Sequence, residues 1–167
     1  NASVNLHYSG TIGAVLEACM KGIPAVGYSL RTLQKECDFS PYEETVLRVA
    51  RYVLQYGLDR GVCLNVNFPQ VAELQGISVC RMAKGNWKQE WKETNNDGEY
   101  LLTGCFVNLE PESEDTDYWA IDHGMAAVTP LHLDATHYPS LCHIKEKNTV
   151  VELKENGLIN FIKSLDF

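Results

Sequence analysis

The turn Tyr8-Ser9-Gly10-Thr11 leads directly into a segment with helical periodicity, and its residue types can hold an anion. The first backbone N–H groups of a helix have no partner inside the helix, and the helix dipole adds partial positive charge at the same end. The hydroxyls of Ser9 and Thr11 add two donors beside those amides. The turn therefore predicts a phosphate-binding helix start, although a capped helix start without any ligand explains the same residues.

An amphipathic helix must follow this turn and position it. The residues that recur at the spacing of one buried stripe are Ile12, Val15, Leu16, Cys19 and Met20. Gly22 and Pro24 end the helix, and Ala25 to Ser29 follow as a short buried strand. The order of turn, helix and strand is half of a βαβ unit. No strand precedes the turn and the first residue is Asn1 rather than Met, so we expect the chain to be part of a longer protein that is cut just before a functional loop.

The middle and end of the chain continue the alternation of helices and strands. Ser40, Pro41 and Glu43 have the spacing of a capped helix start, and Gly57 ends that helix. Its buried stripe is predicted at Val46, Val49, Ala50, Val53 and Leu54. The predicted strands are Cys63–Phe68, Ile77–Met82, Met125–Thr129 (ending at Pro130) and Thr149–Lys154. A terminal helix is predicted from Leu158, Ile159, Phe161, Ile162 and Leu165. This rhythm predicts an α/β fold with a mainly parallel sheet covered by helices.

Residues 87–106 are predicted to form a long β-hairpin. The turn signal is Asn95-Asn96-Asp97-Gly98, which lies between two alternating segments, and these residue types tolerate positive φ. Trp87 and Trp91 are placed on one face of the hairpin by the period of two. Two tryptophans on a protruding hairpin indicate a surface that a partner buries.

Composition limits the classes of function. The chain has 167 residues, is 45% hydrophobic, and carries a net charge of −8 with a sequence pI of about 5.1. It is therefore long enough for one domain with a real core, while its acidity argues against binding to polymeric nucleic acid. No apolar run approaches the roughly 20 residues that a membrane span needs. The six cysteines contain no Cys-x-x-Cys pair, which favours reduced thiols and a cytoplasmic location.

Two groups of titratable residues invite a metal hypothesis and are set aside. The ligand types at His132, Asp134, His137, Cys142 and His143 suit zinc, but their spacing is irregular and the segment resembles a loop that crosses the surface. The acidic stretch Glu110–Asp117 contains Pro111 and is interpreted as a solvated linker. No metal site is therefore assigned within the chain.

Four segments resemble the SurE family, the stationary-phase survival nucleotidases. Residues 1–17 are similar to its Asn-x-Gly-x-Asn loop, Tyr-Ser-Gly-Thr turn and small-residue helix, and residues 22–29 to the helix exit and next strand. Leu64-Asn65-Val66-Asn67-Phe68-Pro69 resembles its Leu-Asn-x-Asn-x-Pro strand, and residues 115–131 its Thr-Asp-x-x-Ala segment with the following Thr-Pro-Leu. The four matches occur in family order and end at residue 131 of 167.

The resemblance implies a fold and a site. The fold is a Rossmann-like three-layer α/β domain with helices on both faces of a mainly parallel sheet, here truncated at its N-terminus, with a protruding β-hairpin. Residues 1–167 are its C-terminal part, with the extended hairpin at 87–106 and a C-terminal segment with a helix at 139–167. In the family an Asn-Asp-Asp-Gly motif near the N-terminus supplies two aspartates that bind Mg²⁺ or Mn²⁺. By spacing, Asn1 matches the second Asn of Asn-x-Gly-x-Asn, so all metal ligands and the catalytic aspartates are expected outside this chain.

The implied activity is hydrolysis of nucleoside 5′- or 3′-monophosphates to nucleoside and phosphate, as in a phosphoric monoester hydrolase of the 5′-nucleotidase or acid phosphatase type. Ser9, Gly10 and Thr11 are then expected to hold the phosphate, and Asn1 to contact substrate next to the metal. We expect the chain alone to be inactive and the protein to form a dimer or tetramer without membrane partners. Two alternatives stay open: a non-catalytic assembly module on the same fold, and an unrelated α/β hydrolase, for which a Gly-x-Ser-x-Gly elbow is lacking here.

Overall fold

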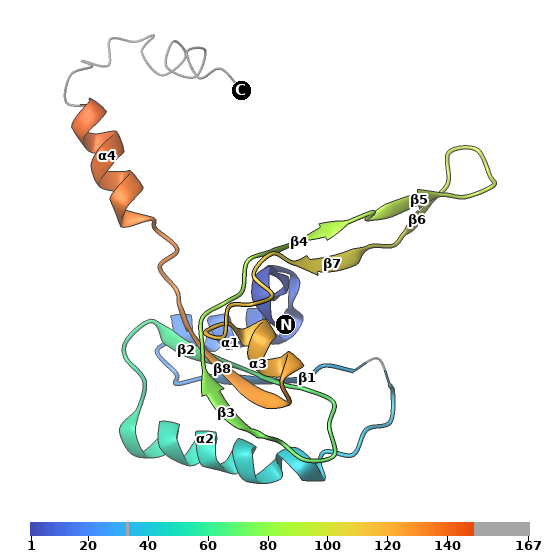
Figure 1. Cartoon of the computed structure of the whole chain (residues 1–167). Coiled ribbons are helices and arrows are strands. Elements are labelled where there is room, and N and C mark those ends of the chain that lie inside the picture. Colours follow the sequence, from blue (N-terminus) through green and yellow to red (C-terminus); the bar gives the residue numbers. More distant parts are fainter. Residues whose placement is uncertain (33, 149–167) are drawn as a thin grey trace. The chain divides into compact units, whose positions relative to one another are not determined.

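The computed structural model describes residues 1–32 and 34–148, and the chain divides into two compact units, Asn1–Leu133 and Asp134–Phe167. The first unit contains a sheet of four strands, β1 (Val26–Leu30), β2 (Val62–Phe68), β8 (Met125–His132) and β3 (Gly76–Val79), in that order (Figure 1). The pairs β1–β2 and β3–β8 are parallel, whereas β2–β8 is antiparallel. The prediction of an α/β fold with a mainly parallel sheet is confirmed.

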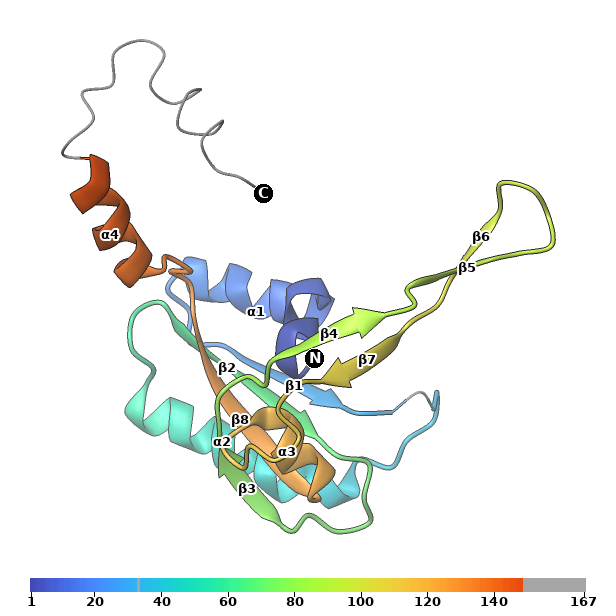
Figure 2. The ribbon, with the colours of Figure 1, turned by 45° about the horizontal axis from the view of Figure 1, so that its top comes forward.

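Helices cover both faces of this sheet (Figure 2). The turn η2 (Ser40–Tyr42) and helix α2 (Glu43–Tyr56) pack through Tyr42, Val49 and Val53 on one face. The other face carries η1 (Ser3–Tyr8), α1 (Gly10–Met20) and α3 (Asp117–Asp122). The side chains of β2 alternate between the two layers, with Leu64, Val66 and Phe68 toward α2. The structure therefore has the three layers that the sequence predicts.

Helix α1 begins and ends as predicted. The Ser9 hydroxyl accepts the backbone N–H of Ile12 at 3.1 Å, which satisfies one of the unpaired donors of the first turn. At the other end Gly22 adopts a φ of +75°, the left-handed conformation in which glycine has no steric penalty. Ile12, Val15 and Cys19 are buried, but Met20 is exposed, so its predicted place in the buried stripe is wrong.

Helix α2 starts later than predicted. Ser40–Tyr42 form a separate 3₁₀ turn, and the Ser40 hydroxyl donates to Asp38 instead of capping the helix. The helix ends at Gly57 as expected. Val49 and Val53 are buried, whereas Leu54 is exposed, because it lies beyond the edge of the face that meets the sheet. The predicted burial of Leu54 is therefore wrong.

Strands β3 and β8 differ from their predicted limits. Strand β3 ends at Val79, short of the predicted Met82. Strand β8 continues through Pro130 to His132, so the prediction that Pro130 ends it is wrong. The Val128 carbonyl accepts the N–H of Cys80, so the backbone groups of Val128 point toward the side of β3. Backbone groups alternate in direction along a strand, so the nitrogen of Pro130, two residues later, points to the same side. Pairing with β3 stops at Val128, and the missing N–H of Pro130 therefore breaks no ladder.

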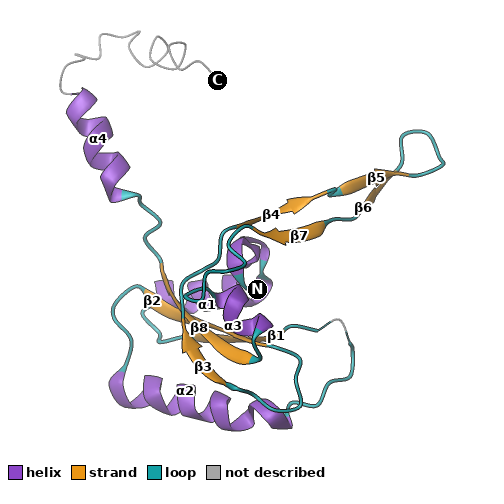
Figure 3. Cartoon of the chain, in the orientation of Figure 1, coloured by secondary structure: helices purple, strands orange, loops and turns teal. Residues whose placement is uncertain are grey.

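The predicted hairpin is confirmed as two ladders in line, β4 (Gly85–Lys88) with β7 (Cys105–Asn108) and β5 (Trp91–Glu93) with β6 (Tyr100–Leu102) (Figure 3). Gly98 in the connecting turn has a φ of +77°. Between the ladders Gln89 and Gly104 both have positive φ, so the strict alternation is interrupted. Trp87 and Trp91 differ accordingly in environment, with 40% and 71% of their surface exposed.

The described part of the second unit is helix α4 (Tyr138–Asn148) with the residues that lead into it. The helix includes Cys142 and His143, so the predicted loop character of this segment is wrong from Tyr138 onward. No helix among residues 1–32 and 34–148 is long and apolar enough to cross a membrane. The strand predicted at Thr149–Lys154 and the terminal helix predicted after Leu158 lie outside the described residues.

Candidate functional site

Polar side chains gather on one face of the sheet, at the carboxyl ends of β1 and β2. The register pairs Gly27 with Asn65 and Ser29 with Asn67. Because side chains alternate along a strand, these four residues share the face opposite α2. Asn65 and Asn67 are buried in a strand that is otherwise apolar. The carboxyl edge of parallel strands is where open α/β sheets bind ligands, which makes this face the candidate site.

Asn1 joins the two strands. Its side-chain amide donates to the Ser29 hydroxyl, and its backbone carbonyl accepts the Asn65 amide at 3.0 Å. The Asn65 carbonyl oxygen in turn accepts the Asn67 amide at 2.9 Å. The structure thus brings Asn1, the predicted polar contact to substrate, into one hydrogen-bonded chain with Ser29, Asn65 and Asn67.

A cleft with a volume of about 800 Å³ opens beside this chain of amides. Its lining is mainly polar or aromatic and includes Asn1, Asn5, Ser29, Arg31, Gln34, Asn67, Gln70, Trp87 and Tyr118. Arg31 has the only charged side chain among the residues that line the cleft, and its guanidinium pairs with Asp122 of α3 at 2.5 Å. The side chains of the cleft therefore offer many neutral hydrogen-bonding groups and one cation.

The predicted phosphate-holding residues Ser9, Gly10 and Thr11 do not line the cleft. Gly10 and Thr11 are exposed at the start of α1, and the Ser9 hydroxyl already accepts the N–H of Ile12. A Cβ added to Gly27 would meet the Thr11 methyl at 3.4 Å. Gly27 is two residues from Ser29 on the same strand face, so β1 connects the helix start to the site of Asn1. The role of Ser9, Gly10 and Thr11 in binding phosphate stays a prediction.

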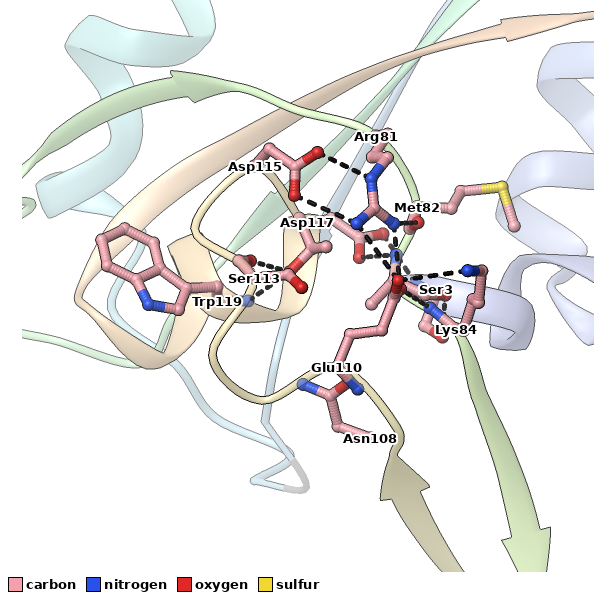
Figure 4. Close-up of polar contacts among 12 residues, drawn as sticks. Ser3, Arg81, Met82, Lys84, Asn108, Glu110, Ser113, Asp115, Asp117 and Trp119 are labelled. Atoms are coloured by element: carbon pink, nitrogen blue, oxygen red, sulfur yellow. Dashed lines mark hydrogen bonds and ion pairs between the residues drawn. The ribbon is translucent and has the colours of Figure 1, made fainter.

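Asp117 fixes the segment that carries Asn1 and Asn5. Its Oδ2 accepts the N–H of Ser3 at 2.7 Å and its Oδ1 accepts the N–H of Ala83 at 2.9 Å, and the carboxyl group is fully buried (Figure 4). Ser3 has a φ of +56° and donates its hydroxyl to the Ala83 carbonyl at 2.8 Å. Burial raises the pKa of Asp117, and the amide donors oppose that rise. The interpretation of Glu110–Asp117 as a solvated linker is therefore wrong at Asp117.

An ionic cluster closes the base of the hairpin next to this carboxylate (Figure 4). Arg81 pairs with Glu110 at 2.9 Å and with Asp115 at 2.7 Å, and Lys84 also approaches Glu110. The hydrogen bonds from Arg81, followed by the Lys84 backbone N–H, lower the pKa of Glu110 to about 2. The Glu110 side chain is only 15% exposed. The acidic stretch therefore ties the hairpin to the sheet.

The described residues do not form a metal site of their own. In residues 1–32 and 34–148 no three His, Cys, Asp or Glu side chains are grouped so that they could hold an ion. The residues that line the cleft include no carboxylate, whereas Mg²⁺ and Mn²⁺ prefer carboxylate oxygens. The cleft as described therefore does not fit such an ion without additional ligands. His123 stacks on Trp119 with ring centroids 3.8 Å apart, in keeping with a structural role.

The six cysteines are free thiols, as predicted, and Cys19, Cys63 and Cys80 are buried. Burial, with a smaller contribution from Cys19, raises the pKa of Cys63 to about 11. A thiol with so high a pKa is a poor nucleophile at neutral pH. Cys63 is therefore a poor candidate for a catalytic nucleophile.

Sequence reasoning missed most of the cleft. The sequence places Ser29 in a strand and Trp87 in the hairpin but neither of them in the site, gives Arg31 no role, and places Asp117 in a linker. A signal was present for Asn65 and Asn67, because two amides alternate within a strand whose other residues are apolar. Buried polar groups need hydrogen-bond partners, so such a pattern indicates a polar network over that face.

Comparison with known proteins gives consistent matches. The family profile described as "Survival protein SurE" matches residues 1–89. The chain is 48% identical over 154 residues to the 5′-nucleotidase SurE of Phocaeicola vulgatus, and the match covers 90% of this chain and 60% of that protein. It is 42% identical over 141 residues to the 5′-nucleotidase SurE of Bacteroides thetaiotaomicron, and that match covers 83% of this chain and 54% of that protein. The crystal structure of the SurE protein from Aquifex aeolicus superposes with a TM-score of 0.73 at 30% identity, covering 89% of this chain and 61% of that one. The chain thus spans between 54% and 61% of the length of these relatives.

Proposed function

The chain belongs to the SurE family, and on this premise we propose that the protein hydrolyses nucleoside 5′- or 3′-monophosphates to nucleoside and phosphate. Two of its relatives carry the name 5′-nucleotidase SurE. The single observation that carries the proposal is the hydrogen-bonded chain from Asn1 through Asn65 to Asn67, which borders a polar cleft at the carboxyl edge of the sheet. Each side-chain amide carries two N–H donors, so an amide that donates once within this network keeps a second N–H that can be offered to a phosphate oxygen.

The residues of this chain bind and orient the substrate. Asn1 is held by Ser29 and by Asn65, so its position at the border of the cleft is set before any ligand arrives. The free backbone amides at Gly10 and Thr11, together with the Thr11 hydroxyl, are suited to phosphoryl oxygens next to this point. Donors that are fixed in advance stabilise the charge that develops on those oxygens during hydrolysis.

A divalent ion, Mg²⁺ or Mn²⁺, is part of the proposal, and its ligands are assigned to residues outside this chain. The absence of carboxylates among the residues that line the cleft motivates this assignment. It follows that the chain alone should not hydrolyse a phosphomonoester.

The test is phosphate release from a panel of nucleoside monophosphates, with and without Mn²⁺, by this chain and by a longer protein that includes the upstream sequence. We expect metal-dependent release from the longer protein only. Release by the 167-residue chain would contradict the assignment of the metal ligands. If the longer protein is folded and releases phosphate from none of the monophosphates, the nucleotidase proposal is overturned.

Thr11 offers a matched pair of variants in the longer protein. Thr11→Val keeps the shape of the side chain and removes the hydroxyl, whereas Thr11→Ser keeps the hydroxyl. A hydrogen bond to a charged group contributes about 1.5–3 kcal/mol, so kcat/KM should fall about 10- to 100-fold for Thr11→Val. Thr11→Ser should stay within about threefold of wild type on the same reasoning. Equal values of kcat/KM for the two variants would show that the Thr11 hydroxyl does not bind the phosphate.

One observation favours assembly as a second candidate function. The outer ladder of the hairpin exposes the apolar side chains of Trp91, Tyr100 and Leu102. Burial of this surface in a dimer or tetramer fits the proposed homo-oligomer. Sedimentation of wild type and Leu102→Glu tests it: a smaller species for the variant supports assembly through the hairpin, and an unchanged species contradicts it. A cytoplasmic location stays a prediction, consistent with the six free thiols.

A further inference from the structure

Trp87 is held in place from several sides at the base of the hairpin. Its indole N–H donates to the Asn5 side-chain oxygen at 2.8 Å. Its ring meets Phe106 edge to face, with centroids 6.0 Å apart, and Phe106 lies against Tyr118 at 4.7 Å. The indole is therefore oriented by contacts that leave 40% of the residue exposed.

The exposed part of Trp87 borders the cleft. Trp87 and Tyr118 are the aromatic residues among its lining, which otherwise includes the amides of Asn5, Gln34 and Gln70. The volume of about 800 Å³ lies within the range of roughly 300–1,000 Å³ that is typical of small-molecule sites. An aromatic wall next to several amides suits a planar ligand whose edges carry hydrogen-bond donors and acceptors.

We propose that Trp87 is the wall of a nucleobase subsite in this cleft, on which the base of the substrate stacks while its phosphate points toward Asn1. The proposal rests on the proposed nucleotidase function and adds the part of the site that recognises the base. A nucleobase is the planar group with polar edges that a nucleoside monophosphate carries. Stacking of a base on an aromatic side chain contributes about 1–3 kcal/mol and tolerates different bases. Trp87 then selects nucleotides over phosphomonoesters that have no base, with little preference among bases.

Trp91 provides an internal control, because it belongs to the same hairpin but is 71% exposed and does not line the cleft. The experiment is an NMR titration of the protein with adenosine that follows the indole N–H signals of its three tryptophans. Adenosine carries the base without the phosphate, so neither the metal nor hydrolysis affects the result. We expect a saturable shift of the Trp87 signal with little change at Trp91, and no shift of Trp87 with ribose 5-phosphate.

Two substitutions separate stacking from packing. Trp87→Leu should weaken the binding of adenosine at least fivefold, whereas Trp87→Phe, which keeps an aromatic ring, should stay within about threefold of wild type on the stacking magnitudes given above. Trp91→Leu should bind like wild type. Circular dichroism and urea midpoints establish that each variant is folded.

The proposal is overturned if adenosine does not shift Trp87, if Trp87→Leu binds adenosine like wild type, or if Trp87→Phe loses as much affinity as Trp87→Leu. These outcomes are distinct from a failure of the nucleotidase proposal, which is measured by phosphate release. Base-dependent binding without any phosphate release would support the nucleobase subsite and contradict the nucleotidase proposal. Phosphate release without base-dependent binding would support the nucleotidase proposal and contradict the subsite.

Discussion

Replacement of Asp117 by alanine should be among the most damaging single changes to the first unit. The substitution leaves the N–H groups of Ser3 and Ala83 without an acceptor in a buried place. Each unsatisfied buried donor costs about 1–3 kcal/mol, so we expect a loss of about 2–6 kcal/mol in the free energy of unfolding. That is a large share of the roughly 5–15 kcal/mol that stabilises a typical domain.

The structure also predicts that other substitutions at and near Asp117 lower the free energy of unfolding by smaller amounts. Asp117→Asn keeps the volume, but it places an NH₂ group against one of two N–H donors, so it should lose about 1–3 kcal/mol. Asp115→Asn is the matched control: Asp115 lies two residues away, pairs with Arg81, and its side chain is 67% exposed, so its loss should stay below about 1 kcal/mol.

Urea unfolding followed by circular dichroism measures these differences, and hydrogen exchange locates them. The N–H of Ser3 should lose protection in Asp117→Asn more than amides of α2, because the left-handed φ of Ser3 is maintained by the contacts to Asp117 and Ala83. If Asp117→Ala loses no more stability than Asp115→Asn, the two buried hydrogen bonds do not support the segment of Asn1, and this account of the site is refuted.

Two further predictions concern the packing of α1 and the base of the hairpin. Gly27→Ala should lower the free energy of unfolding in urea by about 1–3 kcal/mol, because the added Cβ would lie 2.9 Å from Val15 Cγ2. Gly13→Ala is the control: its added Cβ would have nothing within 4 Å, and it should stabilise α1 by about 0.5–1 kcal/mol. Equal effects of the two substitutions would contradict the close approach at Gly27. Glu110 has a pKa lowered from its ordinary value of 4.5 to about 2, so its contribution is present above about pH 4.5 and is lost as the pH falls toward 2. The stability difference between wild type and Glu110→Gln, measured by urea unfolding from pH 7 to pH 2.5, should shrink over this interval, and a constant difference would exclude the ion pair as its cause.

Elements whose limits are set by local chemistry could be predicted from the sequence. Ser9 caps α1, Gly22 and Gly57 end helices with a positive φ, and the turn at Gly98 closes the hairpin. In each case the residue type itself favours the conformation that it adopts, whatever the rest of the chain does. The helix–strand alternation then predicts the α/β class.

Features that depend on distant partners could not be predicted. Pro130 continues a strand only because β3 ends before reaching it, and Asp117 is buried only because Ser3, 114 residues earlier, returns to it. Met20 and Leu54 fit the helical period and are still exposed in the structure, since periodicity does not give the width of the face that is covered. The lining of the cleft is the hardest feature to predict from the sequence, because its residues come from η1, the end of β1, β2, the hairpin and α3.

Strand β2 shows why the core and the site are specified together. Val66 faces α2 in the apolar core, while Asn65 and Asn67 lie on the opposite face and hydrogen-bond to each other, and Asn67 lines the cleft. A slip of one residue in the pairing with β1 would exchange the two faces, because the side-chain period of a strand is two. Both asparagines would then enter the apolar layer under α2, at a cost of about 1–3 kcal/mol for each amide left without a partner. The amides that border the cleft therefore also penalise the wrong register, and the strand that places them for binding is held in register in part by those same side chains.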